Sequence, residues 1–398
     1  MNKRYLRLSI LVFFLFAPIV TSAASSFEVS GWIPYWRTAT GTADALAHLS
    51  LLSEIDPFVY TLRLDGTLSD NGHLDQEPWA NLIATAHANH VRVVPSVMTS
   101  NGDLLHTLLS HTKSRRALAK RIADLVKENG FDGIDIDFEG KHAEDKRYFS
   151  LFLQGLYQRI GDKMLMCTIE SRTPTDSRYY GTSIPVDAEM YANDFVQINK
   201  YCDRVRIMTY DQQGVDQKLL ADAASSSEVY APIADIEWVE KVMKLVAQSI
   251  KKSKLMIGIP TYGYEYEVTA YANNEYLYKI LWPFNPAYAT QIATQYNVVP
   301  MRNRAGEMYL TYTPIDVSSS SPLSSVPREA LAASALASTI ATSNNTHLVF
   351  HLLDWSDAGA IQDKINLAKK LGLRGVSLFK IDGGEDPNMW NVLAGVRR

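Results

Sequence analysis

The sequence predicts an α/β protein, a (β/α)8 barrel with a small α+β insertion between its seventh and eighth strands. Apolar, β-branched runs of strand length recur eight times, and stretches with helical spacing of apolar residues separate most of them. The last two runs are separated by about 110 residues, which is too long for a simple helical crossover. A doubly wound open sheet is the alternative, but no glycine-rich dinucleotide turn follows the first run.

The eight candidate strands are residues 27–36, 57–64, 91–98, 133–139, 164–171, 204–211, 254–263 and 375–382. The helical patterns between them cover residues 79–89, 116–129, 146–160, 238–249 and 361–371. Asn129-Gly130 is a left-handed cap signal that ends the second of these helices. Strand and helix therefore alternate in the order that a parallel barrel requires.

The insertion is expected at about residues 265–350. A tyrosine-rich stretch at 264–278 opens it, a helical pattern follows at 286–296, and a strand pattern at 307–313. Residues 318–325 form a serine-rich loop, and 330–342 are a further candidate helix. Both secondary-structure types occur here, so we expect a small α+β unit on the rim of the barrel.

The N-terminus predicts a signal peptide at 1–24 ahead of a barrel domain at 25–398. Lys3, Arg4 and Arg7 precede an apolar stretch at 8–20, and small residues run up to Ala24. We expect secretion or a periplasmic, cell-envelope location, with no stable membrane span after cleavage; an uncleaved anchor is the alternative.

Composition narrows the set of partners. The net charge of -4 and the pI near 6.2 argue against nucleic acid. The nine histidines lack metal-ligand spacing, so we expect no metal. We also expect no cofactor, and we expect the protein to be a monomer. Cys167 and Cys202 could form a disulfide, but their positions within and just ahead of strands favour two buried free thiols.

The octapeptide at 132–139, Asp-Gly-Ile-Asp-Ile-Asp-Phe-Glu, carries the chemistry. Its period of two places Asp135, Asp137 and Glu139 on one face of a strand, successive carboxylates about 7 Å apart. Unpaired carboxylates are expensive to bury, so this face should line a polar cleft, with Glu139 at its open end. Like charges would raise the pKa of Glu139, as a general acid requires. The alternative is that the acids pair with buried basic residues.

These residues resemble the signature of glycoside hydrolase family 18, the chitinase and N-acetylglucosaminidase family. Asp132, Gly133, Asp135, Asp137 and Glu139 match its D-G-x-D-x-D-x-E pattern. Residues 208–211 are similar to its M-x-Y-D, and 258–263 to its G-x-P-x-Y-G. Segments 355–358 and 373–376 look most like the spore-cortex-lysin subgroup, which acts on cell-wall glycan.

The resemblance implies substrate-assisted retaining hydrolysis of an N-acetylglucosamine-containing glycan. Glu139 would act as the general acid and base, Asp137 would orient the acetamide, Asp135 would tune Asp137, and Tyr210 would hydrogen-bond the acetamide oxygen. The residues expected to contact substrate are Tyr35, Glu170, Arg172, Met208, Asp211, Tyr262 and Phe379. For Trp32, on the first strand, a place in the core is favoured.

The sequence departs from the family at two places. Phe379 stands where a tryptophan is frequent, with plain barrel core as its alternative role, and 96–99 keeps only the serine of S-x-G-G. Separately, Arg206 should point inward, where Glu170 is its expected ion-pair partner. The functional alternative is that Glu170 or Arg172 contacts polar substrate, such as a peptide-bearing lactyl group.

The favoured function is a secreted β-N-acetylglucosaminidase acting on peptidoglycan or chitin-like oligomers. A non-catalytic glycan-binding protein on the same fold is the alternative, and an interaction protein that uses the barrel as a scaffold is a third possibility.

Overall fold

The computed structural model describes residues 27–226, 228–314 and 333–396. The predicted signal peptide at 1–24 and the predicted serine-rich loop at 318–325 lie outside these described residues. Within the described ranges, none of the helices combines the length and apolar character needed to cross a membrane.

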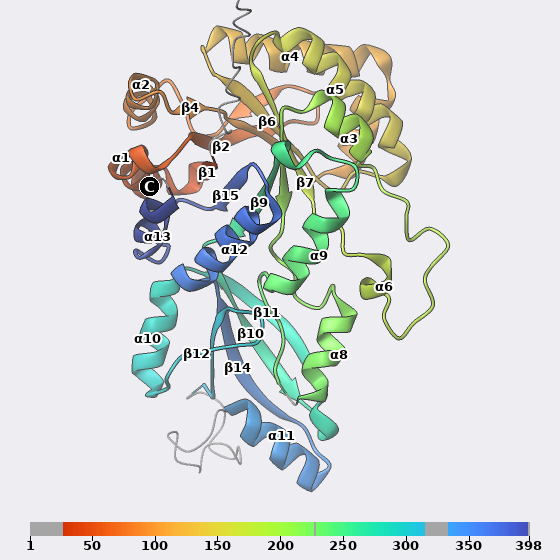
Figure 1. The fold of residues 1–398 in the computed structure, drawn as a ribbon, viewed down its shortest axis with the longest axis vertical. Helices are drawn as coiled ribbons and strands as arrows, with labels where there is room; N and C mark the ends of the chain where they lie inside the picture. The colour runs from red at the N-terminus through yellow and green to blue at the C-terminus, as the bar shows by residue number, and fades with distance from the viewer. Residues whose placement is uncertain (1–26, 227, 315–332, 397–398) are drawn as a thin grey trace, which may run out of the picture.

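Eight parallel strands form a closed barrel (Figure 1). Their order is β1-β15-β9-β8-β7-β6-β5-β2, and β1 pairs with β2 to close the circle. They are β1 (Glu28–Pro34), β2 (Glu54–Leu62), β5 (Ser96–Thr99), β6 (Gly133–Phe138), β7 (Met164–Glu170), β8 (Arg204–Met208), β9 (Leu255–Pro260) and β15 (Gly375–Phe379). Two short strands, β3 (Leu68–Asp70) and β4 (Arg92–Val93), pair with β2. The predicted barrel is confirmed, and the open-sheet alternative is excluded.

Helices connect the strands and surround the barrel. Outside the insertion they are α1 (Thr38–Ala47), α2 (Trp79–Ala88), α3 (Gly102–Ser110), α4 (Thr112–Glu128), α5 (Lys146–Ile160), α6 (Thr175–Arg178), α7 (Phe195–Tyr201), α8 (Gln217–Ser225), α9 (Ile236–Val246), α12 (Ala358–Leu371) and α13 (Met389–Val396). Each of the five predicted helices is present. Helix α12 begins before residue 361 because the Asp357 side chain caps the Ala360 amide. Helix α4 ends as predicted, with Gly130 at φ 67°.

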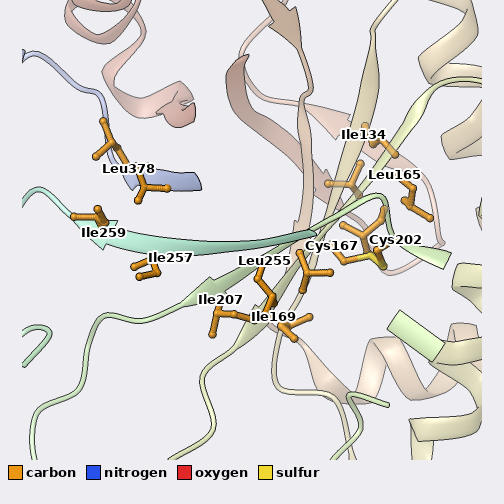
Figure 2. Packing of buried hydrophobic residues seen from close by; sticks show 14 of the residues in the cluster. Ile134, Leu165, Cys167, Ile169, Cys202, Ile207, Leu255, Ile257, Ile259 and Leu378 are labelled. Atoms are coloured by element: carbon orange, nitrogen blue, oxygen red, sulfur yellow. A yellow bond between two sulfur atoms is a disulfide. The ribbon is translucent and has the colours of Figure 1, made fainter. Parts of the chain in front are cut away.

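Alternation along the strands separates the two faces of the barrel wall. The outward side chains of β6 to β9 and β15, such as Ile134, Leu165, Ile257 and Leu378, pack in one large core (Figure 2). Their neighbours in sequence point inward, and these include acids, Thr168 and other polar residues. The apolar layer holds helices to strands, which leaves the barrel interior free to carry charged groups.

The insertion follows β9 and contains a second, antiparallel sheet in the order β11-β10-β14-β13-β12. Its elements are β10 (Gly263–Ala270), β11 (Tyr276–Phe284), α10 (Pro286–Tyr296), β12 (Met301–Arg302), β13 (Met308–Tyr312), α11 (Ala333–Asn344) and β14 (Leu348–Trp355). An insertion between the seventh and eighth barrel strands was predicted and is confirmed. The buried Glu307 carboxylate accepts the amides of Ile233 and Ala234, which fastens this unit to the segment that follows β8.

The prediction of two free thiols is wrong, because Cys167 and Cys202 form a disulfide. Cys167 points outward from β7, and Cys202 follows α7 on that same outer side, so their Cα atoms lie 6.0 Å apart (Figure 2). This separation falls within the range that a disulfide spans. Sequence position alone suggested poor geometry because it did not show that the link from α7 to β8 lies against β7, where the Asp203 amide donates to the Leu165 carbonyl.

Candidate active site

Strand β6 carries three carboxylates from the barrel interior to its open end. Asp135 is fully buried, Asp137 is 3% exposed, and Glu139, just after the strand, is partly exposed. The Glu139 amide donates to the Thr99 carbonyl at 2.9 Å, which holds this residue against the end of β5. The carboxylates thus form a row that ends where the barrel meets solvent.

Asp135 is the centre of a buried hydrogen-bond network. Its Oδ2 accepts from Ser96 Oγ at 2.8 Å and from Trp32 Nε1 at 3.1 Å, and its Oδ1 accepts from Thr168 Oγ1 at 2.8 Å. Trp32 is 1% exposed, as its expected place in the core requires. Ser96, the one residue of the S-x-G-G pattern that this chain keeps, therefore positions Asp135, the deepest of the three acids.

The predicted ion pair of Arg206 with Glu170 is wrong. Arg206 points inward as expected, but Nη2 lies 2.5 Å from Glu54 Oε1 and 2.6 Å from Asp56 Oδ1, and Nη1 lies 3.3 Å from Asp135 Oδ2. In the register, Arg206 is opposite Thr168, two residues deeper than Glu170, so it reaches acids across the barrel floor. An alternative drawn from the sequence was that the acids on β6 pair with buried basic residues. That alternative holds for Asp135, which pairs with Arg206.

Burial raises the pKa of both upper carboxylates. For Asp137 the first cause is burial, and the charges of Glu139 and Asp135 add to it. For Glu139, burial comes first and the charge of Glu170 second, while Lys141 acts in the opposite direction. A carboxyl group with a raised pKa and a partly exposed position can hold a proton near neutral pH and deliver it to a ligand.

The turn after Glu139 is held by Glu170, at the end of β7. Gly140, at φ 64°, donates its amide to Glu170 Oε1 at 2.9 Å, and Asn193 Nδ2 donates to Oε2 at 2.7 Å. Lys141 Nζ lies 3.2 Å from Oε2, and its side chain is 1% exposed. Burial alone would raise the pKa of Glu170, but the Lys141 charge and the hydrogen bonds lower it. The sequence reasoning missed Lys141, although a base directly follows the acidic signature.

Two tyrosines and an aspartate lie at the ends of β8 and β9. Tyr262 Oη donates to Asp211 Oδ1 at 2.5 Å, and Asp211 has a left-handed backbone at φ 56°. Burial raises the pKa of Asp211, whereas hydrogen bonds from Tyr262 and Tyr264 oppose the rise. Burial also raises the pKa of Tyr210, and the charge of Asp137 raises it further. The Tyr210 hydroxyl therefore keeps its proton and can donate a hydrogen bond to a ligand.

Phe379 forms an aromatic floor beside these groups. Its ring is stacked on Tyr210 with centroids 5.4 Å apart and lies 6.1 Å from Tyr262 and 5.8 Å from Trp32. It is partly exposed and also packs against buried neighbours, so its contact with substrate stays a prediction. Met208, also partly exposed, packs in the same cluster.

Two predicted contact residues lie at the rim, outside this group. Tyr35 is in a short 3-10 turn (Tyr35–Arg37), is 38% exposed, and packs edge-on against Trp36 at 5.1 Å. The Arg172 guanidinium lies over the rings of Tyr191 and Phe195 rather than among the acids. The structure thus gathers the acids, Tyr210, Asp211, Tyr262 and Phe379, and places these two at the edge.

One group of potential metal ligands occurs among the described residues. Ligand atoms of His106, His142 and Glu144 lie within 4.8 Å of one another, and the last two side chains are 42% and 69% exposed. His106 already contacts the buried Asp145 at 2.8 Å, and His142 contacts Asp103 at 3.1 Å. The absence of a metal from the reaction stays a prediction.

Comparisons with known proteins agree with this geometry. The model of the family described as glycosyl hydrolases family 18 matches residues 28–384. An uncharacterized glycosylase YvbX of Bacillus subtilis is 27% identical over 42% of this chain and 44% of its own length. A cortical fragment-lytic enzyme of the same organism is 22% identical over 81% of this chain and 64% of its own length. The chain therefore spans less than two thirds of these curated relatives.

Solved structures share the fold. The Bacillus cereus spore cortex-lytic enzyme SleL has a TM-score of 0.67 at 20% identity, covering 93% of this chain and 74% of its own. A class V chitinase from Pseudomonas fluorescens has a TM-score of 0.68 at 19% identity, covering 94% of this chain and 100% of its own. At these identities the likeness establishes the architecture alone.

Proposed function

The chain belongs to family 18 of the glycosyl hydrolases, and from this premise we propose that it cleaves β-1,4-linked glycans containing N-acetylglucosamine by substrate-assisted retaining hydrolysis. The observation that carries the proposal is the pair formed by Asp137 on β6 and Glu139 just after it. Asp137 is buried and Glu139 reaches solvent, and the pKa of each is raised. Glu139 is thus suited to donate a proton, while Asp137, one inward step deeper, is suited to accept a hydrogen bond from a bound sugar.

In the first step Glu139 donates its proton to the glycosidic oxygen as the bond from that oxygen to the anomeric carbon breaks. The carbonyl oxygen of the sugar's own 2-acetamido group forms a bond to that carbon and gives an oxazolinium ion. Asp137 accepts a hydrogen bond from the acetamide N–H and balances the positive charge. Tyr210 donates its hydroxyl proton as a hydrogen bond to the acetamide oxygen.

In the second step the Glu139 carboxylate takes a proton from water, and the water oxygen attacks the anomeric carbon. The bond from that carbon to the acetamide oxygen breaks, so the acetamide is restored and the configuration is retained overall. Asp135, balanced by Arg206, contributes to the raised pKa of Asp137. Phe379 and Tyr262 supply apolar surface for the sugar ring, and Asp211 supplies a hydrogen-bond acceptor. A further carboxylate nucleophile is not required.

The test is incubation of the protein with chitin oligomers and with muropeptides. We expect cleavage by the wild type and a loss of about 10²–10⁴-fold in kcat for Glu139→Gln. Glu128→Gln, the same chemical change at the exposed end of α4, should leave kcat unchanged. If neither substrate is cut, the glycan-binding alternative replaces the proposal; if Glu139→Gln keeps full activity, the acid is misassigned.

The route through the acetamide has its own test. A cyclic inhibitor that mimics the oxazolinium ion should block turnover. Indifference to it would indicate a protein nucleophile, for which Glu170 is the suspect because it lies behind the same turn.

We also propose a periplasmic or secreted location, on the basis of the basic, apolar and small residues at 1–24. The Cys167–Cys202 disulfide supports an oxidising compartment. Fractionation of cells that express the full chain tests this location, and recovery in the cytoplasmic fraction would contradict it.

A further inference from the structure

A pocket of about 290 Å³ lies beside the turn that follows Glu139. The ends of β6 and β7 and the segment that leads into α7 enclose it. Its lining includes Lys141, Glu170, Arg172, Tyr191, Asn193 and Phe195. Because Glu170 also holds the Gly140 amide, this pocket adjoins the proposed proton donor.

Among the residues that the structure describes, one positive charge of the pocket has no ion-pair partner. Glu170 is paired with Lys141 and also accepts from Asn193, so these two charges cancel. Among the described residues, no carboxylate forms an ion pair or hydrogen bond with the Arg172 guanidinium. Glu189 acts on it only through space. The remaining charge is that of Arg172.

Two aromatic rings fix the Arg172 side chain. Its Cζ lies 3.5 Å from the centroid of the Tyr191 ring and 4.4 Å from that of Phe195. Rings that pack on a guanidinium cover its faces and leave its in-plane N–H groups free to donate. Held in one plane, these donors match the two oxygens of a carboxylate, and less side-chain entropy is lost on binding.

We propose that this pocket is a subsite for a carboxylate carried by a substituent of the glycan, with Arg172 as the residue that binds it. The inference rests on the proposed function and deepens it. The volume of the pocket is at the low end for ligand pockets, which suits a substituent rather than the glycan chain. The carboxylate comes from an O-lactyl group or from a peptide attached to that group. Peptidoglycan carries both, whereas the N-acetylglucosamine units of chitin are uncharged.

The test compares three substrates: neutral N-acetylglucosamine oligomers, glycan oligomers with free lactyl carboxylates, and the same oligomers with peptides. Arg172→Gln should lower kcat/KM on the carboxylate-bearing substrates by about 10–100-fold. It should change kcat/KM on the neutral oligomers by less than about 2-fold. A peptide is joined to the lactyl carboxyl by an amide bond, so the peptide-bearing units have no free lactyl carboxylate. A loss confined to the peptide-bearing oligomers therefore assigns the carboxylate to the peptide, a loss confined to the oligomers with free lactyl groups assigns it to the lactyl group, and a loss on both shows that the subsite binds either carboxylate.

Arg147→Gln is the matched control, because it removes the same charge from the exposed surface of neighbouring α5. It should leave all three substrates unaffected. Arg172→Lys keeps the charge but loses the planar fork, so it should fall between wild type and Arg172→Gln. If Arg172→Gln unfolds, the wild type alone gives the answer: added salt should reduce its preference for charged substrates.

An equal loss on all three substrates would overturn the subsite and make Arg172 a structural residue. Absence of any preference for the charged oligomers in the wild type would also overturn it, while the glycosidase proposal would stand. Failure of the proposed function has a different signature, in which neither charged nor neutral oligomers are cut.

Discussion

Lys141 and Glu170 form an ion pair, Nζ to Oε2 at 3.2 Å, directly behind the turn that follows Glu139. The two charges act on Glu139 in opposite directions: Glu170 raises its pKa and Lys141 lowers it. Burial is the main cause of the raised pKa of Glu139, and this pair adjusts the pH range in which Glu139 keeps the proton that it is proposed to donate.

Removal of either charge should shift the basic limb of the pH–kcat/KM profile, and the two shifts should have opposite signs. A general acid works while it is protonated, so activity is lost as pH rises through its pKa. Lys141→Met raises the pKa of Glu139 and moves this limb to higher pH. Glu170→Gln lowers the pKa and moves the limb to lower pH, each by about one pH unit. Rate profiles between pH 4 and 9, about the range in which a carboxyl with a raised pKa titrates, measure both.

A surface ion pair supplies the control. Lys244 and Glu240 lie 2.8 Å apart along α9, and Lys244 is 63% exposed. Lys244→Met should leave the profile in place. Shifts of the same sign in Lys141→Met and Glu170→Gln would show that these variants act by distorting the turn rather than through charge.

The fold could be predicted because its signals are local. The alternation at 132–139 and the apolar spacing of 286–296 each lie within one element, and β6 and α10 were found there. Strands β11 and β14 were not predicted, and neither was the division of the third strand into β4 and β5. A strand in an antiparallel insertion is defined by its partners, and β14 lies between β10 and β13, far from β10 in sequence.

At the site, too, the local sequence predicted the direction of a side chain but not its distant partners. Period two predicts which side chains point inward, and it placed Arg206 correctly. It does not say how far across the barrel a long side chain reaches, so the partners Glu54 and Asp56 were missed. The disulfide was missed for a related reason, since the contact of Cys202 with β7 depends on tertiary packing and not on the local sequence.

Arg206→Leu should destabilise the fold by about 3–5 kcal/mol at neutral pH, because it leaves buried carboxylates without a counter-ion. The loss should be smaller near pH 5. Burial already raises the pKa of Asp56, and removal of Arg206 raises it further. A carboxyl whose folded pKa exceeds its unfolded value is tolerated while protonated and destabilises as pH rises through the folded pKa. Urea unfolding at pH 5 and pH 7.5 measures the difference.

Arg92 gives the comparison for this prediction. It contacts Glu54 at 3.0 Å and is 31% exposed, so Arg92→Gln should cost about 1 kcal/mol or less. A loss for Arg206→Leu that is the same at both pH values would mean that lost packing, and not unpaired charge, is responsible.

The double variant Cys167→Ala/Cys202→Ala should lose about 3–4 kcal/mol of unfolding free energy, the chain-entropy value for a closed loop of this length. The two cysteines are 35 residues apart and both are fully buried. Dithiothreitol in the denaturation buffer should lower the unfolding midpoint of the wild type to that of the variant. It should have no effect on the variant itself. A wild-type midpoint that does not respond to reductant after full unfolding would contradict a stabilising disulfide.

Phe379→Ala should reduce kcat/KM on N-acetylglucosamine oligomers by about 10–100-fold, because a sugar ring would lose the apolar surface beneath it. The Phe379 ring stacks on the Tyr210 ring with centroids 5.4 Å apart, so the substitution also removes a contact that positions Tyr210. The hydroxyl group of Tyr210 is the one proposed to hold the acetamide. The loss should therefore appear in kcat as well as in KM. Phe379→Trp enlarges the same surface and should retain at least wild-type kcat/KM. If Phe379→Ala lowers only the unfolding temperature and leaves both kinetic constants intact, Phe379 is a packing residue, and the sugar must be supported by other side chains of the site.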